Sequence, residues 1–125
     1  MNFPGDLLYS PEHLWVRDLG QGLVRVGVTD FAQDQLGRVI YVDLPTVGQA
    51  VGAGREMGAV ESAKSVSDLI CPVDGQVTAV NAELAEEPAP VNDDPYGAGW
   101  LAEIKMAGPL PQGLMSSEAY RQTVA

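Results

Sequence analysis

Glycine and proline interrupt this chain throughout its length and restrict it to short elements. Fourteen glycines and nine prolines are spread over 125 residues. Both residue types favour turns, because glycine adopts backbone conformations that other residues avoid, and proline disrupts helices and central strands. Between the turns lie short runs rich in β-branched residues. The pattern predicts a mainly β fold built from many short strands.

The clearest strand pattern covers residues 22–28, where valines alternate with Arg25 and Gly27. This alternation predicts a strand with one face in the core. Proline, glycine and β-branched residues mark other strands along the chain. We expect these further strands at residues 37–45, 56–62, 67–73, 75–81 and 99–106.

A short helix is predicted directly after the first of these strands. Asp30 followed by Gln33 resembles a capping box, and Gly37 is a typical helix stop. Phe31 and Leu36 should then face the core. Two more helical segments are expected, namely a single turn at 84–87 and a C-terminal helix at about 116–124, capped by Ser116 or Ser117.

The chain also contains a weak internal repeat. The segment GRVIYV, which begins at residue 37, recurs as GQVTAV at residue 75, and GAGREMGAV at residue 52 recurs as GAGWLAEIK at residue 97. The order is the same in both halves, and Lys64 lies between the copies. Two related β-units predict a flattened barrel or sandwich with the Lys64 turn at one end.

Length and charge limit the classes of function. The length of 125 residues suits one domain, residues 1–125. A formal net charge of −10 repels phosphate groups, so we expect neither nucleic-acid nor membrane binding. No apolar run is long enough to span a bilayer, and the N-terminal residues lack a signal-peptide pattern. We therefore expect a cytoplasmic protein.

The residues needed for common catalytic sites are missing. A single cysteine, Cys71, excludes an internal disulfide, and one cysteine with one histidine cannot form a tetrahedral zinc site. No phosphate-binding loop or nucleophile elbow occurs. We interpret Cys71 as a buried thiol and His13, beside Trp15, as a structural residue. The chain is expected to be a carrier or a binding module and not an enzyme.

Lys64 lies between two strand-like runs, at the tip of a predicted hairpin. Its neighbours, such as Ala63 and Ser65, are small, and the nearest cations in the sequence are Arg55 and Lys105. A modifying enzyme would therefore meet one accessible amine at this turn. The residues alone leave two interpretations open, a lysine that serves solubility and a covalent attachment site.

The segment VESAKSVSDL resembles the lipoylation segment of glycine cleavage system H proteins. The resemblance extends through YSPEHLWV, VRVGVTDFAQDQLGRVIYVDLPTVG, CPVDGQVTAVNAEL and PVNDDPYGAGWLAEIK, which together cover most of the chain. On these motifs the chain is identified as a member of that family. The resemblance implies a lipoyl-domain-like β-sandwich or flattened barrel, a barrel-sandwich hybrid, with short helices.

The resemblance also implies a function. Lys64 would carry lipoic acid in amide linkage as a swinging arm, and the chain itself would catalyse nothing. The arm would take an aminomethyl group from the pyridoxal-phosphate glycine decarboxylase (P protein) and deliver it to the tetrahydrofolate-dependent aminomethyltransferase (T protein). Dihydrolipoamide dehydrogenase (L protein) would reoxidise it. A lipoate ligase or an octanoyltransferase would attach the group, and we expect a monomer.

One position departs from the family pattern. The family usually has His–Glu–Trp where this chain has His13, Leu14 and Trp15. That glutamate, with an aspartate that matches Asp68, is thought to hold the cationic arm in a cleft. If residues 12–15 are extended, Glu12 shares a face with Leu14 and can replace the missing carboxylate.

The remaining site candidates lie around the turn and the arm cleft. Glu61 and Asp68 are candidates for recognition of the turn or for lining the cleft, and Glu12 and His13 for the cleft alone. Two alternatives to the glycine system stay open. One is an H-protein-like carrier for another redox assembly, such as lipoate-dependent sulfur oxidation. The other is a non-lipoylated homologue that binds partners through its acidic surface.

Overall fold

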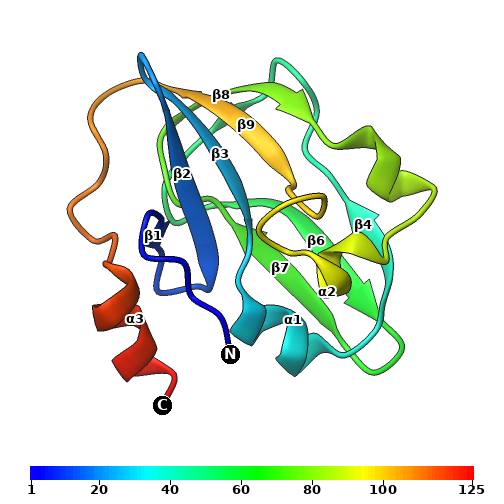
Figure 1. Ribbon diagram of the computed structural model, residues 1–125. Helices are drawn as coiled ribbons and strands as arrows, with labels where there is room; N and C mark the ends of the chain where they lie inside the picture. Colours follow the sequence, from blue (N-terminus) through cyan, green and yellow to red (C-terminus); the bar gives the residue numbers. More distant parts are fainter.

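The computed structural model describes residues 1–125 as two antiparallel sheets with short helices at their margins (Figure 1). The larger sheet has the strand order β1-β2-β3-β9-β8-β5, and the smaller has the order β4-β6-β7. The strands are β1 (Leu8–Tyr9), β2 (Leu14–Gly20), β3 (Leu23–Val28), β4 (Val39–Asp43), β5 (Ala50–Val51), β6 (Glu56–Ser62), β7 (Val66–Ile70), β8 (Gly75–Val80) and β9 (Ala102–Met106). This architecture confirms the predicted mainly β sandwich or flattened barrel.

The main core lies where the inner faces of the two sheets meet. Val24, Val26 and Ile104 come from the larger sheet, and Val42 and Val60 come from the smaller one. All five side chains are buried. The alternating valines of β3 therefore point inward, as the sequence pattern predicts.

The outer face of the larger sheet carries a second apolar group, which we call the outer aromatic cluster. Its members are Phe3, Leu7, Tyr9, Trp15 and Tyr120. Gly27 makes room for it, because a Cβ at that position would lie 2.6 Å from the Trp15 ring. The predicted strand at 22–28 thus has its valines in the core, and the cluster partly covers its second face.

The helices differ in detail from those predicted. They are α1 (Asp30–Leu36), α2 (Pro90–Asp93) and α3 (Ser117–Thr123), with a 3-10 helix, η1 (Ala82–Ala85), before α2. The N-cap of α1 is Thr29, whose Oγ1 accepts the Ala32 N–H, and not Asp30 as predicted. A threonine hydroxyl can cap a helix as an aspartate does, so the sequence pattern was displaced by one residue.

Other helical predictions are confirmed or corrected. Gly37 ends α1 with a positive φ of 76°, and Ser116 caps α3. The expected turn at 84–87 forms earlier, as η1. Leu36 joins the main core, whereas Phe31 packs against the outer aromatic cluster. No helix is both long and apolar enough to cross a bilayer.

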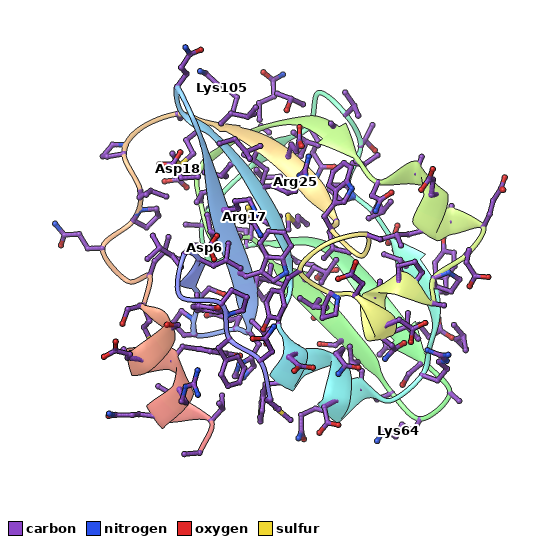
Figure 2. All side chains as sticks on the ribbon, viewed as in Figure 1. Asp6, Arg17, Asp18, Arg25, Lys64 and Lys105 are labelled. Carbon is purple, nitrogen blue, oxygen red and sulfur yellow. The ribbon has the colours of Figure 1, made fainter.

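The internal repeat has a structural counterpart. Its first copy forms β4 and most of β6, which pair in the smaller sheet, and its second copy forms β8 and most of β9, which pair in the larger sheet. The hairpin of β6 and β7 extends from the first of these pairs to one end of the molecule, where Lys64 lies (Figure 2).

Candidate functional site

The turn that carries Lys64 is held by the buried hydroxyl of Ser62. The backbone N–H of Ser62 donates to the Ser65 carbonyl at 2.8 Å, which closes the turn between β6 and β7. Ser62 Oγ accepts the N–H of Ser65 at 3.2 Å and that of Lys64 at 3.4 Å. Ser62 is only 5 % exposed, so it stabilises the turn from the protein interior. The predicted hairpin is confirmed, but no pattern in the sequence indicates this role for Ser62.

Lys64 is exposed at the tip of this hairpin, and its stem passes over the end of α1. A Cβ built on Gly37 would lie 3.2 Å from the Lys64 Cε. The chain has one other lysine, Lys105, and Figure 2 places the two at opposite ends of the molecule. Arg38 lies closer, because Val39 pairs with Ser62, but its guanidinium forms an ion pair with Asp93 at 3.2 Å.

A cleft opens beside the Lys64 turn. It has a volume of about 390 Å³ and lies between β7, the start of β2 and α1. Strand β7 is the edge of the smaller sheet, so no strand pairs with it on this side. Eight of the fourteen lining residues are hydrophobic. The lining residues are Glu12, His13, Leu14, Val28, Phe31, Ala32, Gln35, Leu36, Val60, Ser65, Val66, Ser67, Asp68 and Leu69.

The structure separates the two carboxylates predicted to flank the turn. Asp68 is exposed and lines the cleft, together with Glu12. Glu61 is also exposed but lies outside the cleft, in a cross-strand row with Tyr41 and Val66. Asp68 and Glu12 can therefore contact a cation in the cleft, whereas Glu61 is available to a partner that approaches the turn.

The start of β2 differs from the expected geometry. Glu12 belongs to a turn, and His13 has a φ of 72°, so residues 12–15 are not continuously extended. Glu12 and Leu14 nevertheless both line the cleft. Leu14 is 2 % exposed and belongs to the main core. The turn, and not strand alternation, therefore brings Glu12 to the cleft.

His13 is tied to two distant elements. Its Nδ1 lies 2.8 Å from the Tyr120 hydroxyl on α3, which in turn lies 2.8 Å from Thr29 Oγ1 at the N-cap of α1. Its ring packs on Phe31, with the centroids 4.9 Å apart. Burial lowers the pKa of His13 below its usual 6.5, against a smaller opposing effect of Glu12. A neutral imidazole therefore borders the cleft at neutral pH.

Cys71, in contrast, has no access to the cleft. Its side chain is 1 % exposed, and its Sγ donates to the Val73 carbonyl at 3.1 Å. Burial raises the pKa of the thiol, which keeps it protonated and unreactive. The prediction of a buried structural thiol is confirmed.

Known proteins match this chain over the segments that contain both the Lys64 turn and the cleft residues. A sequence model described as "Glycine cleavage H-protein" matches residues 7–125. The chain is 51 % identical to the glycine cleavage system H protein of Mycobacterium avium, over 98 % of this chain and 97 % of that relative. It is 55 % identical to the H protein of Micrococcus luteus, over 95 % and 94 % of the two chains.

A solved structure agrees with these sequence comparisons. The crystal structure of a glycine cleavage system H protein from Mycobacterium marinum superposes with a TM-score of 0.90 at 40 % identity. The superposition covers 97 % of this chain and 98 % of that one. Because these matches span both sheets, the Lys64 turn and the residues that line the cleft, the chain belongs to the glycine cleavage system H-protein family.

Proposed function

We propose that this protein is the lipoyl carrier of a glycine cleavage system, with lipoic acid in amide linkage to Lys64. The observation that carries the proposal is the placement of Lys64. It lies at the tip of a braced turn, and the next residue, Ser65, lines a cleft that also contains Glu12 and Asp68. An exposed amine beside an acidic, half-apolar cleft suits an arm that alternates between neutral and cationic states.

The chain offers room for such an arm. A lysine extended by a lipoyl group reaches roughly 14 Å, estimated from ordinary bond lengths. Bound there, the group would supply a dithiolane, whose S–S bond would break as one sulfur takes the aminomethyl group with its electron pair and the other becomes a thiol. The apolar residues of the cleft suit the hydrocarbon part of the arm, and its volume of about 390 Å³ is enough for a group of this size.

The carboxylates near Lys64 have two different roles in this proposal. Asp68 and Glu12 favour the cationic aminomethyl state, because carboxylates stabilise an ammonium group in a partly closed site. Glu12 thereby supplies the carboxylate that the family usually has at the position of Leu14. Glu61, on the outside of the turn, is available to the lipoate ligase or octanoyltransferase that modifies Lys64.

The proposed partners are the other components of the system. Glycine decarboxylase loads the arm, aminomethyltransferase transfers the methylene group to tetrahydrofolate and frees ammonia, and dihydrolipoamide dehydrogenase reoxidises the dithiol with NAD. The protein itself is a substrate of all three and acts as a monomer. We place the cycle in the cytoplasm, where the reducing conditions suit the free thiol of Cys71.

Intact-mass analysis tests the attachment site. Co-expression with a lipoate ligase should add the mass of one lipoyl amide to the parent protein. The Lys64→Arg variant should remain unmodified, while the Lys105→Arg variant should be modified as the parent is, because Lys105 lies at the opposite end of the molecule. Modification of Lys64→Arg would overturn the assignment.

A loading assay tests the choice of pathway. The lipoylated protein, incubated with glycine and the pyridoxal-phosphate decarboxylase, should gain the mass of an aminomethyl group. An H protein from one of the relatives named above serves as the positive control. If that control is loaded and this protein is not, the assignment to the glycine system is wrong. A role as carrier for lipoate-dependent sulfur oxidation then replaces it.

A further inference from the structure

The cleft contains one polar ring that the proposed function leaves without a role. His13 lines the cleft, and its Nδ1 is hydrogen bonded to the Tyr120 hydroxyl. No hydrogen bond within the chain involves the other ring nitrogen, Nε2, and because no buried polar side-chain atom lacks a partner, Nε2 is open to solvent. The backbone at His13 is also unusual, because a non-glycine residue with φ near 72° is strained and such residues concentrate at functional sites.

The contacts around His13 hold this strained residue in place. Its N–H donates to the Ser10 carbonyl at 3.0 Å, and its carbonyl accepts the Thr29 N–H at 3.1 Å. The ring is fixed between Tyr120 and Phe31. These contacts come from α3, from α1 with its N-cap, and from the turn before β2. The ring is therefore preorganised, and Nε2 keeps a fixed direction.

The hydroxyl groups behind the ring can adopt two hydrogen-bonding patterns without moving any heavy atom. In one, Thr29 donates to Tyr120, Tyr120 donates to Nδ1, and Nε2 carries the proton of the neutral ring. In the other, Nδ1 donates to Tyr120, Tyr120 donates to Thr29, and Nε2 presents a lone pair. Both patterns fit the two 2.8 Å distances, and Thr29 Oγ1 still accepts the Ala32 N–H in each.

We propose that His13 is a positioning residue for the loaded arm, with Nε2 accepting a hydrogen bond from the aminomethyl ammonium and the Tyr120–Thr29 pair holding the proton on Nδ1. This inference rests on the proposed function and deepens it. An ammonium group only donates hydrogen bonds, so its arrival selects the pattern with the lone pair on Nε2. With a neutral arm the hydroxyls can reverse, and Nε2 then donates.

Other titratable groups lie on the turn of His13 and on the elements packed around it, namely Glu12, Asp68 on β7, Asp30 and Asp34 on α1, and Glu118, Tyr120 and Arg121 on α3. Of these, only Glu12 and Asp68 line the cleft. Their carboxylates attract a cation there but do not replace the role of His13. His13 adds one directed acceptor, which is lost when its ring is protonated.

Two substitutions of His13 separate positioning from simple structural support. Glutamine places a polar atom near Nε2 and asparagine places one near Nδ1, and asparagine also tolerates a positive φ better. We expect the His13→Asn variant to release ammonia from the loaded arm about five-fold faster than the parent, the effect of one lost hydrogen bond to a charged group in a half-open site. The His13→Gln variant should stay within about two-fold of the parent, although it melts at a lower temperature than His13→Asn.

The protonation of the ring provides a readout independent of the arm's activity. Nitrogen-15 NMR of the His13 ring should show a protonated Nδ1 and an unprotonated Nε2 in the loaded protein, and a lower His13 pKa than in the unloaded lipoylated protein. The Tyr120→Phe variant should shift the proton toward Nε2. The Tyr9→Phe variant is the matched control, because it removes a hydroxyl from the stacked partner of Tyr120 that donates only to the Pro4 carbonyl.

The outcomes distinguish this proposal from the proposed function. A protein that cannot be loaded overturns the function itself, together with the ligand of His13. A protein that loads normally, but whose decay is the same in the Asn and Gln variants or whose Nε2 is protonated in the loaded state, overturns the positioning role alone. Equal ring protonation in Tyr120→Phe and the parent would overturn the part assigned to Tyr120.

Discussion

At the scale of single residues, Leu14 serves the core and the cleft at once. It is 2 % exposed, packs in the main core and lines the cleft. We expect Leu14→Glu to lower the free energy of unfolding by about 2 kcal/mol, because a carboxylate would replace a buried apolar side chain. The same variant should slow the loss of ammonia from the loaded arm, since it adds a carboxylate to the cleft.

Thermal melts and decay assays on the same samples check this expectation. Leu14→Met is the control for packing, because it keeps the side chain apolar at similar volume. A Leu14→Glu protein as stable as the parent, with unchanged decay, would show that the side chain turns to solvent and that position 14 has no bearing on the arm.

His13 should make the stability of the protein depend on pH in mildly acidic solution. Burial lowers its pKa below the 6.5 of an unfolded chain. Between those two pKa values the unfolded chain binds more protons, so the free energy of unfolding falls as the pH drops from 6.5 through the folded pKa. Urea unfolding of the parent and of His13→Asn at a series of pH values should show that the variant loses this component. Parallel curves for the two proteins would contradict it.

The sequence predicts some of these residues and not others for a physical reason. The exposed turn of Lys64 is recognisable because it is local, with small neighbours on both sides, whereas its role as an attachment site is implied only by the resemblance to H proteins. The partners of His13 are not, because Tyr120 and Thr29 reach it only through the fold, and Tyr120 lies 107 residues away in the sequence. A lone histidine beside a tryptophan is a typical structural residue, so the pattern itself indicated no more than that.

At the scale of elements, the Lys64 hairpin depends on one buried hydroxyl. Ser62 Oγ accepts two backbone N–H groups of the turn and donates to the Ser65 carbonyl. We expect Ser62→Ala to lower the free energy of unfolding by about 1 kcal/mol and to slow lipoylation of Lys64, because the turn would lose its preferred shape. The assay is the initial rate of lipoyl transfer by a purified ligase.

Ser67 provides a matched control for Ser62. It is exposed, lies on the next strand and lines the cleft, but its hydroxyl makes no hydrogen bond within the chain. Ser67→Ala should therefore keep both the stability and the rate of the parent. If Ser62→Ala is acylated as fast as Ser67→Ala, the shape of the turn does not limit recognition by the ligase.

Elements whose two faces see different environments were predicted well, and those covered on both faces were not. The alternation of β3 is clear because its valines face the core. Strand β2 has no such alternation, since Leu14 and Val16 enter the main core while Trp15 enters the outer aromatic cluster. All three side chains are buried, and no period-two pattern remains. The short α2 was also not predicted, because its segment is rich in proline and acidic residues and is typical of a loop.

At the scale of the whole molecule, the two apolar clusters divide the protein between them. The main core joins the sheets and supports the Lys64 hairpin, whereas the outer aromatic cluster fixes both ends of the chain to the larger sheet. Tyr120 of α3 stacks on Tyr9 at 4.8 Å, and Phe3 meets the Tyr120 ring edge-on. Through Tyr120 this cluster also reaches His13, so the C-terminal helix helps to hold a residue that lines the cleft.

This arrangement predicts a loss of stability in alkaline solution. Burial raises the pKa values of Tyr9 and Tyr120, and it raises that of Tyr96, which packs against the cluster, to about 12. Above pH 10 the unfolded chain releases phenol protons that the folded chain retains, so the free energy of unfolding falls from pH 10 toward pH 12. Urea unfolding at a series of alkaline pH values, with tyrosinate absorbance recorded in parallel, measures this loss.

The Tyr96→Phe variant tests the contribution of one phenol. It should be less stable than the parent at neutral pH, because it lacks the Tyr96 hydroxyl, which donates to the Asn2 carbonyl and accepts the Asp30 N–H. Its stability should then fall less steeply with pH than that of the parent. Equal slopes for the two proteins would show that Tyr96 ionises freely in the folded state and that the cluster is open to solvent at that side.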